Sequence, residues 1–342
     1  MANFDEKYFL ETFEELIKID STTGCYEEIQ AHICKTLEDM GVKYHTLRKG
    51  GVIAELGGKE PALAVTAHFD AIGLMVRHIN ADGTLCVCPV GGLYPVYCVT
   101  ENVRIHTRAG KVFTGCICRT PNSVHVTEDE LRKEVGDFDK NVCVVLDEDV
   151  KSADDVRKLG IETGDDVALE PRFTLANGYI KSRFIDDKAA VAILLTTIKA
   201  IKDTNTNRKL YFYFAAYEEI GHGTTWLPDD VKDILAVDIA PTGEKQTSDE
   251  RKVSIFCKDS RIPYHWAMTN ELKAAAEKAN IPFVMDIFTP HYGTDCEGSI
   301  SAGYDIRFAA IGFGTANSHG YERTQLDGIK ATYDLLNAYI SV

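Results

Sequence analysis

Side chains that can bind a metal ion stand where two apolar strands are expected to end. The run ALAVTA leads into His68 and Asp70, and the run LYFYFAAY leads into Glu218 and Glu219. Imidazole and carboxylate groups together form a mixed nitrogen and oxygen ligand set, which suits zinc, cobalt or manganese and does not suit soft thiolate chemistry. These residue types therefore predict a metal-dependent site.

Further segments add donors of the same kind. Asp238 follows the apolar run LAV, His319 follows FAAIGFG after a short loop, and Asp186 and Asp187 stand just before an expected helix. Each motif alone is more often a local hydrogen bond or a solvated turn. Their joint placement at the ends of buried strands is costly, because desolvating a carboxylate without a partner is strongly unfavourable. A shared cation removes that cost, so the combination favours a metal site.

The adjacent acids Glu218 and Glu219 are expected to have different roles. Consecutive residues at a strand end point in opposite directions, so the two cannot face one ion equally. If Glu219 is the ligand, Glu218 is free to accept a proton from a water whose pKa a metal ion lowers to about 7. Asp70 lies two residues after His68 and is expected to accept its other ring N–H and orient the imidazole. We therefore predict Glu218 and Asp70 as catalytic residues.

The elements that must position these residues alternate in type. Helices are expected over 6–19, 27–40, 188–201, 266–279 and 326–340, and strands over 52–56, 62–67, 210–216, 235–239, 283–288 and 308–313. Strands separated by helices predict a doubly wound mixed α/β sheet with helices on both faces. Ligands of such sheets collect beyond the carboxyl ends of the strands, which is where the candidate residues fall.

The middle third of the chain has a different pattern. Asp82-Gly83 and Ala109-Gly110 each join two β-rich runs, as in hairpins, and VCVVL and DVALEP add short strands. One polar helical stretch falls near 152–159. We therefore expect a discontinuous catalytic domain, 1–72 and 178–342, with a small β-barrel-like domain inserted at 73–177.

Composition excludes several classes of partner. The 52 acidic and 37 basic residues give a formal charge of -15, which repels nucleic acid and anionic membrane surfaces. No stretch approaches the roughly 18 apolar residues of a membrane span, and the acidic amphipathic start has no signal-peptide core. The ten cysteines include no Cys-x-x-Cys pair. We expect reduced thiols and a cytoplasmic protein.

Six motifs, in this order and spacing, resemble the glutamyl/tetrahedral aminopeptidase family of co-catalytic metallopeptidases (clan MH): HFDAIG, SRFIDDKAA, YEEIGHG, AVDIAPTG, HYGTDCEGS and NSHGYERT. The resemblance covers nearly the whole chain. It implies an aminopeptidase that hydrolyses the first peptide bond of short peptides with two divalent metal ions per subunit, zinc being expected and cobalt or manganese the alternatives. It also implies a homo-oligomer, a hollow tetrahedral dodecamer built from dimers, in which the inserted domain makes contacts.

The resemblance also implies a role for individual residues. Glu218 would be the general base, and the peptide bond between Asp186 and Asp187 would be cis. The chain departs from the commoner family pattern at Ile239-Ala240 and around 317–324, which bears on substrate preference more than on catalysis. The implied ligands are His68, Asp186 and Asp238 for one ion, and Glu219, Asp186 and His319 for the other, with Asp186 bridging.

The preferred first residue stays open at this stage. Cationic side chains near the motifs would favour an acidic first residue: Arg183, Arg261, His265, His291 and Arg323. The resemblance places the segment Gly293-Thr294-Asp295 near that pocket. His222 is interpreted as a structural residue of a Gly-His-Gly turn and not as an extra ligand.

Two other functions compete with this interpretation of the sequence. A glycoside hydrolase needs two carboxylates about 5 to 9 Å apart across a sugar, which adjacent glutamates do not provide naturally, and it leaves His68 and His319 without a role. A metal-stabilised scaffold or regulatory homologue without activity would keep the ligands. The presence of Glu218 argues against it, since a structural site has no use for an unliganded base.

Overall fold

The computed structural model describes residues 3–120, 123, 125–127, 135–204, 206 and 208–341. The chain divides into two compact units. The first contains Met1–Ser21, Tyr26–Asp70 and Arg172–Val342, and the second contains Thr22–Cys25 and Ala71–Pro171. All the predicted ligand residues belong to the first unit.

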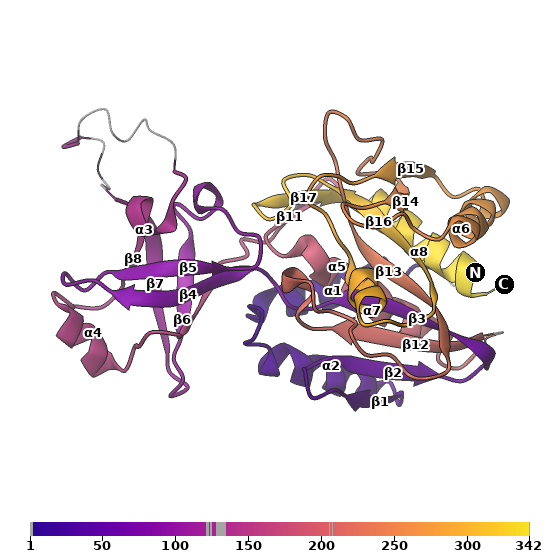
Figure 1. The fold of residues 1–342 in the computed structure, drawn as a ribbon, viewed down its shortest axis with the longest axis horizontal. Coiled ribbons are helices and arrows are strands. Elements are labelled where there is room, and N and C mark those ends of the chain that lie inside the picture. Colours follow the sequence, from indigo (N-terminus) through magenta and orange to yellow (C-terminus); the bar gives the residue numbers. More distant parts are fainter. Residues whose placement is uncertain are drawn as a thin grey trace. The chain divides into compact units, whose positions relative to one another are not determined.

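The first unit is built on an eight-stranded sheet with the strand order β1-β2-β12-β3-β13-β16-β14-β15 (Figure 1). β12, β3, β13 and β16 run parallel, so their carboxyl ends lie at one edge of the sheet. β2 and β14 pair antiparallel with the outer members of this group, which makes the sheet mixed, as predicted. The strands are β1 (Lys43–Thr46), β2 (Val52–Leu56), β3 (Lys59–His68), β12 (Arg208–Ala215), β13 (Val231–Pro241), β14 (Val253–Lys258), β15 (Phe283–Ile287) and β16 (Arg307–Thr315).

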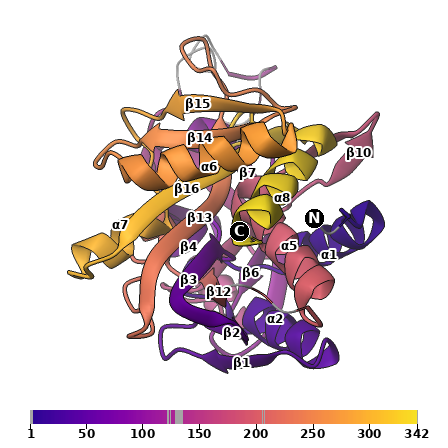
Figure 2. The same cartoon turned by 90° about the vertical axis from the view of Figure 1, so that its right-hand side faces the viewer.

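Helices cover this sheet on both faces, as the alternating pattern predicted. α5 packs against β3 and β13 with α1 and α8 beside it, whereas α7 contacts β3, β13 and β16 and lies across the sheet from α5 (Figure 2). Every residue from Ala189 to Leu195 of α5 is fully buried, which explains why its sequence is apolar on all sides. The helices are α1 (Glu6–Lys18), α2 (Glu27–Asp39), α5 (Ile185–Ile201), α6 (Trp266–Ala279), α7 (Asp295–Ser301) and α8 (Leu326–Ile340).

A second, three-stranded sheet of the first unit was not predicted. It contains β10 (Thr174–Ala176), β11 (Tyr179–Ser182) and β17 (Glu322–Gln325) in that order. The pairing places Ser182 opposite Glu322, so the chain entering α5 lies beside the segment that follows His319. These strands are too short to show a clear period in the sequence.

The second unit is a closed barrel with the strand order β4-β5-β8-β7-β6-β9. Its hairpin turns have Gly83 at φ +86° and Gly110 at φ +78°, where glycine is favoured, so the two Gly-based hairpins are confirmed. The elements are β4 (Gly73–Ile79), β5 (Leu85–Val90), η1 (Pro95–Tyr97), β6 (Asn102–His106), β7 (Val112–Arg119), α3 (Phe138–Asn141), β8 (Val142–Leu146), α4 (Ala153–Leu159) and β9 (Asp166–Leu169).

Two further features concern the cysteines and the hydropathy of the helices. All ten cysteines are free thiols. Within the described part of the chain, none of the helices combines the length and apolar character needed to cross a membrane.

Candidate metal centre and active site

The side chains predicted from separate strand ends line one cavity of about 470 Å³ in the first unit. β3 supplies a residue at its last position, β13 supplies one within the strand, and α5 supplies one at its start. The turn after β12 and the loop after β16 supply the others. The cavity brings together His68, Asp186, Glu218, Glu219, Asp238 and His319.

Asp186 lies between two imidazoles. Its Oδ1 is 3.2 Å from Nε2 of His68, and its Oδ2 is 3.6 Å from Nε2 of His319. Glu219 Oε2 lies 3.5 Å from the same nitrogen of His319. Asp186 and Asp187 have non-helical backbone angles before the regular part of α5, and the peptide bond between them is cis, as expected. Each carboxylate oxygen of Asp186 therefore faces a different imidazole.

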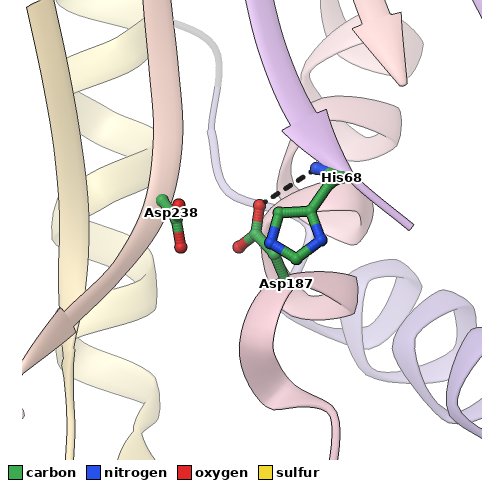
Figure 3. A group of neighbouring side chains, drawn as sticks. All are labelled: His68, Asp187 and Asp238. Atoms are coloured by element: carbon green, nitrogen blue, oxygen red, sulfur yellow. Dashed lines mark hydrogen bonds between the residues drawn. The ribbon is translucent and has the colours of Figure 1, made fainter. Parts of the chain in front are cut away.

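A second group of possible ligand atoms contains His68, Asp187 and Asp238 (Figure 3), which lie within 4.8 Å of one another. Asp187 Oδ2 accepts the backbone N–H of His68 at 3.2 Å, whereas Oδ1 is buried without a hydrogen-bond partner. A buried carboxylate oxygen without a partner is costly, and a cation would satisfy it. The sequence placed Asp187 among the possible donors, whereas the ligand set implied by the family resemblance did not include it.

The electrostatics of the site also fit a bound cation. Burial raises the pKa of Asp187 and Asp238 well above the usual range, and neighbouring carboxylates raise it further. Burial also raises the pKa of Glu219 to about 7. Burial opposes ionisation of Asp186 too, but its hydrogen bonds to the two imidazoles lower its pKa below the usual range. The cluster holds more acidic than basic groups, and oxygen and imidazole donors suit a divalent ion.

Glu218 and Glu219 diverge for a different reason from the one predicted. β12 ends at Ala215, and the two glutamates begin a 3-10 turn, η3 (Glu218–Ile220), after Tyr217 with φ +69°. They are therefore not consecutive strand residues. The turn directs Glu218 Oε2 to within 3.7 Å of His68 Nε2, while Glu219 faces His319. Burial raises the pKa of Glu218 well above its usual range.

Asp70 contacts His68 through a different atom from the one predicted. The Nδ1 of His68 is 2.9 Å from the backbone oxygen of Asp70, and the nearer carboxylate oxygen is 3.6 Å away. The Asp70 carboxylate instead accepts the backbone N–H groups of Glu218 at 3.1 Å and of Glu219 at 3.4 Å. The predicted contact between the ring N–H of His68 and the carboxylate of Asp70 was wrong in detail, because two backbone N–H groups compete for this carboxylate. Asp70 thus fixes both the imidazole and the glutamate turn.

Glu322 belongs to the site but was not predicted from the sequence. Its Oε1 accepts the backbone N–H of His319 and its Oε2 accepts that of Asp186, both at 3.1 Å. The side chain is only 2% exposed, and burial raises its pKa to about 8. Glu322 lies in the motif NSHGYERT, but the short strand β17 that brings it to the site was not recognisable from the sequence.

The structure narrows the cationic candidates for substrate selection. Arg261 and His291 line the cavity together with Gly293. The others have different partners: Arg183 is buried and donates to a backbone carbonyl, His265 caps helix α6, and Arg323 pairs with a glutamate. His222 is exposed and is not among the residues that line the cavity.

A mixed sheet with an inserted barrel and an imidazole–carboxylate centre at the strand ends defines the class of metallopeptidase-like α/β proteins. The model of the M42 glutamyl aminopeptidase family matches residues 50–335. The chain belongs to that family and is therefore a peptidase. Membership of this family favours neither the glycoside hydrolase nor the inactive-scaffold alternative.

Individual relatives agree with this assignment. The chain is 37% identical over 97% of its length to "Putative aminopeptidase YhfE" of Bacillus subtilis (strain 168), with 96% of that protein covered. It is 25% identical over 71% of its length to the lysyl aminopeptidase of Pyrococcus furiosus, with 69% of that protein covered. The fold is that of the Pyrococcus horikoshii TET1 peptidase, with a TM-score of 0.86, 23% identity and coverage of 97% of this chain and 99% of that one.

Proposed function

We propose that the protein is a metal-dependent aminopeptidase that holds two divalent ions, with zinc expected and cobalt or manganese as alternatives. The main support is Asp186, whose two oxygens face His68 and His319 separately. Asp238 lies beside the first imidazole and Glu219 beside the second. This arrangement offers two ligand groups that share one carboxylate.

The reaction is hydrolysis of the first peptide bond. When bound, the ions polarise the scissile carbonyl and lower the pKa of the attacking water. Glu218 takes the proton of that water and delivers it to the leaving amine, and its position beside His68 supports this role. Asp70 keeps Glu218 in place through the backbone of the turn.

We further propose that the cavity favours an acidic first residue. The basic residues that line the cavity are histidines and Arg261, and of these Arg261 is the one whose charge does not depend on pH. The family description names glutamyl aminopeptidases, whereas the Pyrococcus furiosus relative is a lysyl aminopeptidase, so the preference depends on the cavity of each chain. His291 is a second basic group of the same wall.

The assembly and location are also proposals. The Pyrococcus horikoshii TET1 peptidase can assemble into a tetrahedron or a large octahedral shell. We propose a homo-oligomer here, a dodecamer built from dimers, with the inserted barrel making contacts. Native mass spectrometry would test the stoichiometry. The ten free thiols support a cytoplasmic location.

One experiment tests the catalytic proposal. The protein is stripped with a chelator, reloaded with zinc, cobalt or manganese, and assayed on matched free and N-acetylated peptides. We expect metal-dependent release of the first residue from the free peptides alone. Equal cleavage of the acetylated peptides would reject an aminopeptidase mechanism.

A matched pair of variants separates the general base from the ligands. Glu218→Gln should keep both ions and lose turnover by about 100-fold to 10,000-fold, the range for general acid–base catalysis. Glu219→Gln should lose metal, as elemental analysis would show. Unchanged turnover in Glu218→Gln would remove Glu218 from the mechanism.

A further inference from the structure

A lysine from a distant hairpin is bonded to the loop that follows the two site glutamates. Lys49 lies in the turn between β1 and β2, and its Nζ donates to the backbone oxygens of His222 and Gly223 and to the hydroxyl of Thr225. The distance to Gly223 is 2.9 Å. These acceptors use all the protons that an ammonium group can donate. Because all the donors of Lys49 are hydrogen-bonded to this loop, we expect the side chain to hold the loop in one position.

The hairpin presents Lys49 from a fixed backbone. The N–H of Leu47 donates to the carbonyl of Gly51 at 2.8 Å, and the N–H of Gly50 donates to that of Leu47 at 2.9 Å. The side chain of Gln30 donates to the Gly50 carbonyl at 2.6 Å, which ties the hairpin to α2. Gly50 has φ +101°, and a Cβ there would lie 2.4 Å from the ring of Tyr26. The turn therefore has little room to move.

The loop that Lys49 holds is in contact with Glu218. A Cβ on Gly223 would lie 3.4 Å from the Cβ of Glu218 and 1.9 Å from Oδ1 of Asp295, so the backbone of Gly223 packs closely against both. Thr224 donates its hydroxyl to the backbone carbonyl of Asp295 at 2.5 Å. The N–H of His222 returns to the carbonyl of Tyr217, at the start of the turn, at 2.8 Å. A displacement of this loop would therefore displace Glu218.

We propose that Lys49 is a positioning residue for Glu218. The carboxylate of Asp70 accepts the backbone N–H groups of the glutamate turn, and Lys49 donates to the loop at the end of the same turn. With both anchors present, the Glu218 carboxylate keeps its place beside His68. The inference rests on the proposed role of Glu218 as general base, and the experiment below separates the two.

The test replaces Lys49 by Met, which keeps most of the side-chain length and removes the donors. We expect kcat to fall by about 10-fold to 100-fold, because small displacements of a catalytic group cost this much, with KM changed by less than about threefold. The content of bound metal should stay that of the wild type. Arg48→Met is the matched control, since Arg48 is an exposed residue of the same hairpin and its loss should leave kcat unchanged.

A double-mutant cycle with Glu218→Gln identifies the route by which Lys49 acts. If Lys49 acts through Glu218, Lys49→Met should cost less than about threefold when Glu218 is already replaced. An equal loss in both backgrounds, or an unchanged kcat in Lys49→Met alone, overturns the positioning role. Full turnover in Glu218→Gln refutes the proposed base instead, whatever Lys49 does.

A milder variant covers the case in which Lys49→Met does not fold. Thr225→Val removes only the hydroxyl acceptor of Lys49 and preserves the shape of the side chain. We expect a smaller fall in kcat with an unchanged melting temperature. An unchanged kcat in this folded variant overturns the proposal.

Discussion

Arg261 offers the sharpest test of substrate selection. Its Nη1 lies 3.0 Å from Oε2 of Glu297, and the Arg261 side chain is 70% exposed whereas that of Glu297 is 10% exposed. Glu297 Oε1 is buried. One oxygen of the Glu297 carboxylate is thus buried and the other is paired with Arg261. A substrate side chain therefore meets the exposed guanidinium of Arg261 before it meets Glu297. We predict that Arg261→Met selectively impairs hydrolysis of substrates with an acidic first residue.

The size of the effect follows from the contact that is lost. A hydrogen bond between charged groups contributes about 1.5 to 3 kcal/mol, and the exposure of Arg261 places its contribution near the lower end. Since about 1.4 kcal/mol corresponds to a factor of ten, kcat/KM for an N-terminal glutamate should fall by about 10-fold. The value for an N-terminal leucine, which makes no ionic contact, should stay within about twofold.

The assay compares p-nitroanilides of glutamate, glutamine, leucine and lysine on the metal-loaded enzyme. The uncharged isostere glutamine separates the contribution of charge from that of size. Arg251→Met serves as the control, because Arg251 is an exposed arginine paired with Asp327 and is not part of the cavity lining. An unchanged ratio of glutamate to glutamine hydrolysis in Arg261→Met would refute the reasoning, as would a wild-type preference for lysine.

Three further substitutions test the supports of the site and the sheet. Asp70→Asn should retain metal and reduce kcat by about 10-fold to 100-fold in steady-state assays, because each Asp70 oxygen accepts one backbone N–H of the glutamate turn and an amide keeps only one accepting oxygen. Glu322→Gln should weaken the affinity for one ion by about 10-fold to 100-fold in metal titrations, because Glu322 likewise accepts two backbone N–H groups of ligand residues. Asp233, 3% exposed, accepts hydrogen bonds from Arg208 at 2.6 Å and from Arg307 at 2.7 and 2.8 Å. The two arginines are partly exposed, so Asp233→Asn should lower the free energy of unfolding by about 1 to 3 kcal/mol. Burial opposes ionisation of Asp233, but the two arginines lower its pKa, so its contribution is present above the unfolded pKa of about 4 and is lost as the pH falls through the folded pKa. Thermal melts between pH 7 and pH 3 should therefore show a steeper loss of stability in the wild type than in Asp233→Asn.

The sequence predicted the helices and strands that have a regular pattern of apolar residues and whose ends are marked by neighbouring residues. The bounds of α6 and α8 agree with the expected 266–279 and 326–340. Both helices have a periodic apolar face, and His265 and Gln325 cap their first turns. The apolar runs of β3, β12, β13 and β16 were also recognisable. Since these strands run parallel, the residues at their ends could be assigned to one edge before any distance was known.

The sequence did not predict features that depend on distant pairing or on backbone conformation. β14 is held at its place by β16 and β15, and β17 by β11, and neither pairing leaves a local signal. The turn at Tyr217 needs a positive φ at a residue type that seldom adopts it, so a simple strand end was expected. The atom by which Asp70 contacts His68 depends on which donors compete for its carboxylate. Such competition is decided only in the folded chain.

These differences share one cause, which also explains how the site is built. The proposed ligand and base residues lie at strand ends, at the start of a helix, in a 3-10 turn and on a loop. Groups that are not themselves predicted ligands fix the backbone of several of these segments. Asp70 holds the two glutamates, Glu322 holds the segments of Asp186 and His319, and Lys49 holds the loop behind Glu218. Such supports act through main-chain atoms, so their residue types carry no metal-ligand signature in the sequence. The donor set could therefore be read from residue types, whereas its geometry depends on three side chains whose roles appear only when the loops are folded.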